Sequence, residues 1–253
     1  MKARILNILN IKPSESGYIF DLLRVQLFIG IANSFVNVVA ISLFIDNFNM
    51  AQLPEVYLIS ALFLLVLNVV YEYMEKRFSP LNLMKYIILG FATILFLLWV
   101  GLNIWDAHAF IFILLIWTTL IYMITGYAYW GLVSQLFNVR ESKRVFSVVG
   151  AGDIPAKLIG YLMAQLLIHR MDFHNLIWFS IGSLICAYFM FRKVTRKKNW
   201  DSIRNKSHGH PHHPPVKAII RKDAVTFFFK HELILAISLL SLISYNVFNL
   251  VDY

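Results

Sequence analysis

An acid and a base lie four residues apart in a stretch of the chain that is otherwise apolar. Residues 150–161 read GAGDIPAKLIGY, so Asp153 and Lys157 share one face if the stretch is helical. Charged side chains are costly within a bilayer unless they face protein or water, which makes the pair a candidate for ligand binding or proton coupling. The alternative is architectural, because a buried ion pair can fasten a helix to its neighbour.

Glycine and proline surround the charged pair. Gly150, Gly152 and Gly160 allow another helix to approach closely, and Pro155 removes one backbone hydrogen bond. Close packing alone explains Gly160. Together these residues predict a kinked, tightly packed helix over residues 146–168, with a local break beside the charges.

Seven apolar segments would position these residues, and each is long enough to cross a bilayer. A hydrocarbon core about 30 Å thick requires about 17–25 helical residues. Since 59% of the 253 residues are hydrophobic, a soluble fold is excluded, and the sequence predicts an all-α integral membrane protein. The segments cover residues 25–45, 56–73, 84–102, 109–130, 146–168, 175–191 and 233–251.

The basic residues lie almost entirely on one side of these segments. They fill residues 1–24 and the connections after the second, fourth and sixth segments, whereas the alternate connections contain one basic residue, Arg170. By the positive-inside rule, residues 1–24 form a cytoplasmic N-terminal segment of a multi-pass protein in the cell (inner) membrane. The formal net charge of +9 therefore reflects topology and contact with the lipid bilayer, and does not indicate a nucleic-acid partner.

The spacing of the segments divides the chain. Short connections join the first six into a transmembrane bundle over residues 25–191, and a longer cytoplasmic linker over 192–232 precedes the seventh helix in residues 233–253. Within the linker, we interpret the histidine- and proline-rich residues 208–215 as a flexible spacer rather than a metal site, and we expect a basic amphipathic helix over 216–231. The layout predicts the N-terminal part of a longer protein with a second transporter half beyond residue 253.

Polar side chains recur at helical spacing along three of the segments. A hydrogen bond between helices explains any single one of them, but their distribution predicts that the first, fourth and seventh helices surround a hydrated space. The residues are Gln26, Gly30, Asn33 and Asn37 in the first helix, Thr118, Tyr122, Thr125 and Tyr129 in the fourth, and Ser238, Ser241, Tyr245 and Asn249 in the seventh.

Two short motifs lie at the entries to the second and fifth helices. Residues 53–61 read LPEVYLISA and residues 140–146 read RESKRVF. With the polar first, fourth and seventh helices, they resemble the major facilitator superfamily, and in particular its ADP/ATP translocase-like (nucleotide transporter) branch. The connection at residues 75–85 departs from the wider superfamily because it lacks the usual Gly and Asp-Arg signature, which argues against a sugar or drug branch.

The resemblance implies a 12-helix major facilitator fold and secondary active transport by alternating access, with nucleotides or another organic anion as the small-molecule solute. Arg24 near the cytoplasmic mouth and Lys157 at depth would then attract the anion, and a phosphate would compete with Asp153 for Lys157. Uptake of a proton by Asp153 when Lys157 moves away is the alternative. The candidate substrate-binding or coupling residues are Asp153, Lys157, Arg24, Asn33, Asn37, Tyr122, Thr125, Tyr129, Tyr245 and Asn249.

The sequence contains no recognisable catalytic set. It has no HExxH motif, Gly-rich phosphate loop or nucleophile elbow, so we expect neither an enzyme nor a metal or cofactor site. The alternative function is a non-transporting membrane scaffold or receptor that has inherited a transporter fold, because a polar cavity can persist without transport.

Overall fold

The computed structural model describes residues 13–104, 107–137, 145–146 and 148–197. These ranges are almost entirely helical, and no strand occurs in them. The elements are α2 (Pro13–Asn47), the 3-10 turn η1 (Met50–Gln52), α3 (Leu53–Arg77), α4 (Pro80–Ile104), α5 (Ala107–Leu136), α7 (Asp153–Ile168) and α8 (Phe173–Lys197).

Five stretches of the described chain are long and apolar enough to cross a membrane. The protein is therefore an all-α, multi-pass membrane protein. α7 has 16 residues, slightly fewer than a full crossing needs, although residues 148–151 just before it are also helical. The five stretches are Ile19–Asn47, Met50–Arg77, Pro80–Ile104, His108–Leu136 and Phe173–Lys193.

Five of the first six predicted segments each lie within one helix that is longer than the apolar run. The fifth, over residues 146–168, corresponds to α7 and to the described helical residues before the turn at Gly152. Proline marks two of the starts, since Pro54 lies in the first turn of α3 and Pro80 begins α4. Proline is favourable there because the first N–H groups of a helix have no partner within it. Lys76 and Arg77 lie in the last turn of α3, where the helix dipole favours positive charge.

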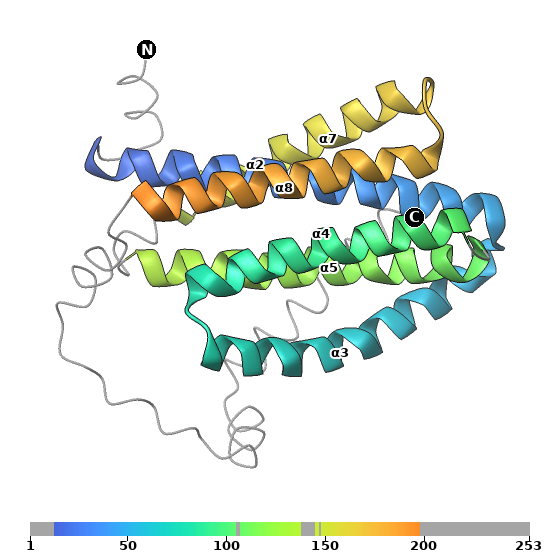
Figure 1. Ribbon diagram of the computed structural model, residues 1–253, viewed down its shortest axis with the longest axis horizontal. Helices are drawn as coiled ribbons and strands as arrows, with labels where there is room; N and C mark the ends of the chain where they lie inside the picture. Colours follow the sequence, from blue (N-terminus) through green and yellow to red (C-terminus); the bar gives the residue numbers. More distant parts are fainter. Residues whose placement is uncertain (1–12, 105–106, 138–144, 147, 198–253) are drawn as a thin grey trace, which may run out of the picture. The chain divides into compact units, whose positions relative to one another are not determined.

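α2 is the central helix of the described part. It packs against α8, α7 and α5, while α4 packs against α5 and α8 and α3 lies at the edge against α5 (Figure 1). Most of the span in α2 is buried, whereas α3 is largely exposed and carries outward apolar side chains such as Leu58 and Leu65. In a bilayer these side chains meet lipid, which explains an apolar surface that water would not tolerate.

The helices reverse direction at alternate ends. Figure 1 shows the α2–α3 and α7–α8 connections at one end of the described bundle, where α4 also ends and α5 begins, and the α3–α4 connection at the other end. This order agrees with the predicted alternation of loops. Residues 1–12, the linker beyond residue 197 and the seventh helix predicted over 233–251 lie outside the described residues.

Candidate functional site

The helix that carries the charged pair is interrupted next to it. Residues 148–151 are helical, Gly152 forms a turn, and α7 begins at Asp153. The Gly152 N–H donates to the carbonyl of Val149, 3.2 Å away, so the turn is tighter than an α-helix. Pro155 follows in the first turn of α7, where its missing N–H costs least. The local break predicted beside the charges is this one-residue turn, in which Gly152 keeps backbone angles close to those of a helix (φ −68°, ψ −23°). The kink stays a prediction.

Asp153 and Lys157 form an ion pair along one face of α7. The Lys157 Nζ lies 2.7 Å from Asp153 Oδ2, and each side chain is 28% exposed. Gln26 of α2 donates from Nε2 to Asp153 Oδ1 at 3.2 Å. Lys157 also donates to the hydroxyl of Tyr122 on α5 at 3.2 Å, and its Nζ lies 4.4 Å from the centre of that ring. Three helices thus contribute to one polar group, which we call the Lys157 cluster: Gln26, Tyr122, Asp153 and Lys157.

The Lys157 cluster lies near the middle of the membrane-crossing region. Asn33 is the central residue of the 29-residue span Ile19–Asn47. Its neighbour Ser34 donates to the backbone carbonyl of Lys157 at 3.3 Å, so Lys157 lies level with the centre of this span. A charge at this depth is costly unless it has protein partners or water. The Lys157 amine has two protein partners, Asp153 and Tyr122.

Small residues hold α7 close to α2 on either side of Lys157. A Cβ added to Gly30 would lie 2.6 Å from the Cβ of Ala156, and one added to Gly160 would lie 2.6 Å from the Cβ of Ser34. No larger side chain fits without moving a helix. We call this contact the α2–α7 seam: Gly30, Ser34, Ala156 and Gly160. It confirms the close packing that the glycines of residues 150–161 predict.

The structure changes the architectural interpretation of the charged pair. Both charges belong to α7, so the ion pair does not itself fasten α7 to a neighbour. The links between helices come from uncharged groups, because Gln26 connects Asp153 to α2 and Tyr122 connects Lys157 to α5. Gln26 belongs to the predicted polar face of the first helix, but sequence reasoning left it out of the candidate site. Its seven-residue distance from Asn33 was the available signal.

Two candidate residues of α5 are occupied by structural contacts. Tyr129 is 1% exposed and donates to the carbonyl of Leu22 on α2 at 3.2 Å. Thr125 is also buried and donates to the carbonyl of Ile121, one turn earlier in its own helix, at 2.6 Å. These hydroxyls satisfy their hydrogen bonds within the bundle, so the polar face of α5 reaches the Lys157 cluster through Tyr122.

The other candidates lie elsewhere or have no assigned contact. Arg24 is exposed and pairs with Asp21 on its own helix at 3.1 Å. Asn33 is half-buried, and its Oδ1 has no hydrogen-bond partner among the described residues. Asn37 is half-buried on the same helix. Tyr245 and Asn249 lie outside the part that the structure describes, so the predicted space between the first, fourth and seventh helices stays a prediction.

The fold and the Lys157 cluster define the class of protein to which the chain belongs, an all-α multi-pass membrane protein with a polar group at mid-depth. No protein-family model, curated protein or solved structure matches this chain. The resemblance to the major facilitator superfamily rests on the residues of the sequence alone.

Proposed function

We propose that the protein is a secondary active transporter that works by alternating access and carries nucleotides or another organic anion. The observation that carries the proposal is the Lys157 cluster, in which the ion pair of Lys157 and Asp153 on α7 has polar partners on α2 and α5. Lys157 lies level with the middle of the apolar span of α2. The proposal includes a major facilitator fold with a second six-helix half, and placement in the cell (inner) membrane with the N-terminus in the cytoplasm.

The contacts of Lys157 suggest how an anion would be held and released. Its amine is shared between Asp153 and Tyr122, and its side chain is partly exposed, so an incoming phosphate or carboxylate could become a third acceptor. Asp153 would remain bound to Gln26 if Lys157 turned toward the substrate. The break at Gly152 lies directly before Asp153, at a point where α7 can change its angle to the preceding helical residues.

Uptake into sealed proteoliposomes tests this function. The full-length protein, with any sequence that continues beyond Tyr253, should accumulate a radiolabelled anion from a panel of nucleotides, phosphorylated metabolites and carboxylates. Lys157→Ala should reduce the flux at least about tenfold, which corresponds to about 1.4 kcal/mol of lost interaction. Lys76→Ala is the matched control, because Lys76 pairs with Glu72 at the same four-residue spacing but both side chains are exposed on α3. Equal loss of flux in the two variants would contradict a role for Lys157.

One observation favours the alternative, a scaffold or receptor that does not transport. The charges of the Lys157 cluster are neutralised by each other, and the α2–α7 seam alone suffices to explain why α7 packs closely against α2. A purified, folded, full-length protein that moves no member of a broad solute panel would support this function and refute transport.

A further inference from the structure

The Lys157 cluster carries no net charge, which limits how it can receive an anion. Asp153 and Lys157 neutralise each other at 2.7 Å, and their partners Gln26 and Tyr122 are uncharged. If Lys157 turns toward an anion, Asp153 loses its cation close to the middle of the membrane-crossing region. An unpaired carboxylate is costly at this depth, so a second positive charge has to accompany the anion.

The neighbouring helices do not supply that second charge. Among the described residues, Lys157 is the only cation that pairs with Asp153. On α5, Tyr129 lies within electrostatic range of Asp153, but its hydroxyl donates to a backbone carbonyl of α2. On α2, Arg24 is exposed and pairs with Asp21. None of these groups can replace Lys157 beside Asp153.

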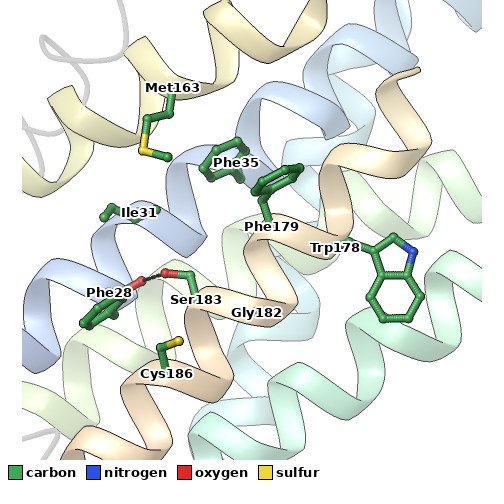
Figure 2. A pocket seen from close by; sticks show the side chains of 9 residues that line it. All are labelled: Phe28, Ile31, Phe35, Met163, Trp178, Phe179, Gly182, Ser183 and Cys186. Carbon is green, nitrogen blue, oxygen red and sulfur yellow. Dashed lines mark hydrogen bonds between the residues drawn. The ribbon is translucent and has the colours of Figure 1, made fainter. Parts of the chain in front are cut away.

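The α8 side of α7 offers no cation either. A groove lies between α7 and α8, which both pack along α2 but make few contacts with each other. Figure 2 shows Met163 of α7 and Phe28 of α2 in its lining, with the Ser183 hydroxyl of α8 donating to the Phe28 carbonyl at 2.7 Å. The lining is apolar apart from this hydroxyl and the thiol of Cys186, and neither carries a positive charge.

Gln26 is placed to hold Asp153 in either charge state. Its Nε2 donates to Asp153 Oδ1 at 3.2 Å, as a carboxylate requires, while its Oε1 is buried and has no hydrogen-bond partner among the described residues. A glutamine amide carries both a donor and an acceptor, and half a turn about its last side-chain bond exchanges them. The turned amide accepts a hydrogen bond from a protonated Asp153. The turn breaks only the existing bond, because Oε1 has no partner to lose.

We infer that Asp153 takes up one proton whenever Lys157 turns toward an anion, and that Gln26 is the positioning residue that accepts the hydrogen bond of this proton. The inference rests on the proposed transport function and names its coupling ion. The proton comes from water on the side where the anion enters and binds to Asp153 Oδ1. It returns to water on the other side when the anion leaves and Lys157 pairs with Asp153 again. The proton requires no cavity, and it keeps the cluster and the bound anionic group neutral together.

Infrared spectroscopy of the full-length protein in vesicles tests the proton site without a substrate. The protein carries aspartate labelled with carbon-13 at the side-chain carboxyl, and Lys157→Ala imitates a lysine that has turned away. Near neutral pH, Asp153 should be ionised in the wild type, whereas Lys157→Ala should gain the C=O band of a protonated carboxyl. Lys157→Ala combined with Asp153→Asn should lack this band.

A folded Lys157→Ala protein without the carboxyl band would overturn the inference, whether or not the protein transports. If Lys157→Ala fails to fold, Lys157→Met removes the same charge and keeps most of the length of the side chain.

Gln26→Met in the Lys157→Ala protein tests the role of the amide. Methionine has a similar length but is a much weaker acceptor, so the carboxyl band of Asp153 should shift to higher frequency as it loses a hydrogen bond. Gln165→Met is the matched control, because Gln165 is an exposed glutamine of α7. Equal band positions in the two variants would overturn the role of Gln26.

Proton movement in sealed proteoliposomes tests the coupling. The probes are the radiolabelled nucleotides, phosphorylated metabolites and carboxylates of the uptake panel, and a pH-sensitive dye is trapped inside. Both pH values stay at least about one unit above the second pKa of a phosphate, about 6, so the charge of the probes changes little. With the outside one pH unit more acidic than the inside, uptake should rise about threefold to tenfold, and the dye should report more acidification than in vesicles given no anion.

Three results of this assay would overturn the inference. Uptake that moves no protons would leave the transport function standing and refute the proton coupling. A zwitterionic solute carried without a proton would show that the second positive charge belongs to the solute. Absence of uptake for every probe would refute the transport function and, with it, the coupling.

Discussion

The ion pair of Lys157 and Asp153 is the point where three helices meet, because Lys157 contacts α5 and Asp153 contacts α2. The Lys157 amine lies 2.7 Å from Asp153 Oδ2 and 3.2 Å from the Tyr122 hydroxyl, while Gln26 occupies the second oxygen of Asp153. A charge-assisted hydrogen bond within a protein contributes about 1.5–3 kcal/mol, and a buried charge left without its partner costs more than that gain. Each contact can be removed separately, so their roles in folding and in binding can be distinguished.

Charge removal should show whether the pair acts as a unit. Lys157→Ala and Asp153→Asn should each destabilise the detergent-solubilised protein by about 1–3 kcal/mol, because each leaves one polar partner unpaired. The double variant should recover at least about 1 kcal/mol of the summed loss, measured in a double-mutant cycle of unfolding free energies. Strictly additive losses would show that the two side chains do not interact in the folded protein.

The same two single variants show whether the substrate carries a negative or a positive charge. For an anionic solute, Lys157→Ala should weaken binding to the full-length protein more than Asp153→Asn does, by about tenfold or more, because it removes the attractive charge. Equilibrium binding of a radiolabelled nucleotide in detergent gives the order. The opposite order would point to a cationic solute.

Tyr122 contributes to Lys157 through both its hydroxyl and its ring. Tyr122→Phe keeps the ring beneath Nζ and removes the acceptor, so the loss of unfolding free energy should be about 1 kcal/mol. Tyr122→Leu removes the ring as well and should cost more. Thermal unfolding of the two variants in one detergent measures the difference, and equal losses would show that the ring contact contributes nothing.

At the scale of the elements, the position of α7 depends on its close packing against α2. The α2–α7 seam brings Gly30 against Ala156 and Gly160 against Ser34, and a third glycine, Gly152, packs against Leu23 where α7 begins. Because the backbones approach this closely, Ser34 reaches the carbonyl of Lys157 and Gln26 reaches Asp153. The geometry of the Lys157 cluster is thus a consequence of small residues on two helices.

Enlarging the α2–α7 seam should separate the helices. Gly160→Leu places a Cβ 2.6 Å from that of Ser34, and the overpacking should cost about 1–3 kcal/mol of unfolding free energy. Gly126→Leu on α5 is the control, because a Cβ there meets no atom within 4 Å. Thermal unfolding in detergent compares the two. A Gly160 variant as stable as the Gly126 variant would show that the helices do not pack closely there.

At the scale of the whole molecule, the connections of the described bundle alternate between two ends (Figure 1). The α2–α3 and α7–α8 connections, at one end, contain Asn49 and Asp172, and the α3–α4 connection, at the other, contains Ser79. The sequence predicts which end is cytoplasmic, since basic residues such as Lys76 and Arg77 accumulate on the side of Ser79. The same asymmetry predicts that Arg140 and Lys206 are cytoplasmic and that Asp106 is not, although these three residues lie outside the described ranges.

Accessibility of introduced cysteines tests this orientation. In a Cys186→Ser background, a membrane-impermeant maleimide added to intact cells should label a cysteine at position 49 or 172. A cysteine at position 79 should react only after the membrane is opened. Labelling of positions 79 and 172 from the same side would contradict the topology, whatever the direction of insertion.

The local features of this protein can be predicted from its amino-acid sequence. Apolar runs define the helices because a bilayer leaves no partner for an unpaired backbone group, and a spacing of four residues brings Asp153 and Lys157 together because a helix repeats every 3.6 residues. Gly152 and Pro155 likewise mark the break before α7. Which helical faces meet follows from the packing of the helices in three dimensions. This packing places Gln26 and Tyr122 against the charged pair. It also places the hydroxyls of Thr125 and Tyr129 against backbone carbonyls and forms the groove between α7 and α8. These contacts depend on the rotation and packing of helices far apart in the chain, which the periodicity of a single helix does not specify.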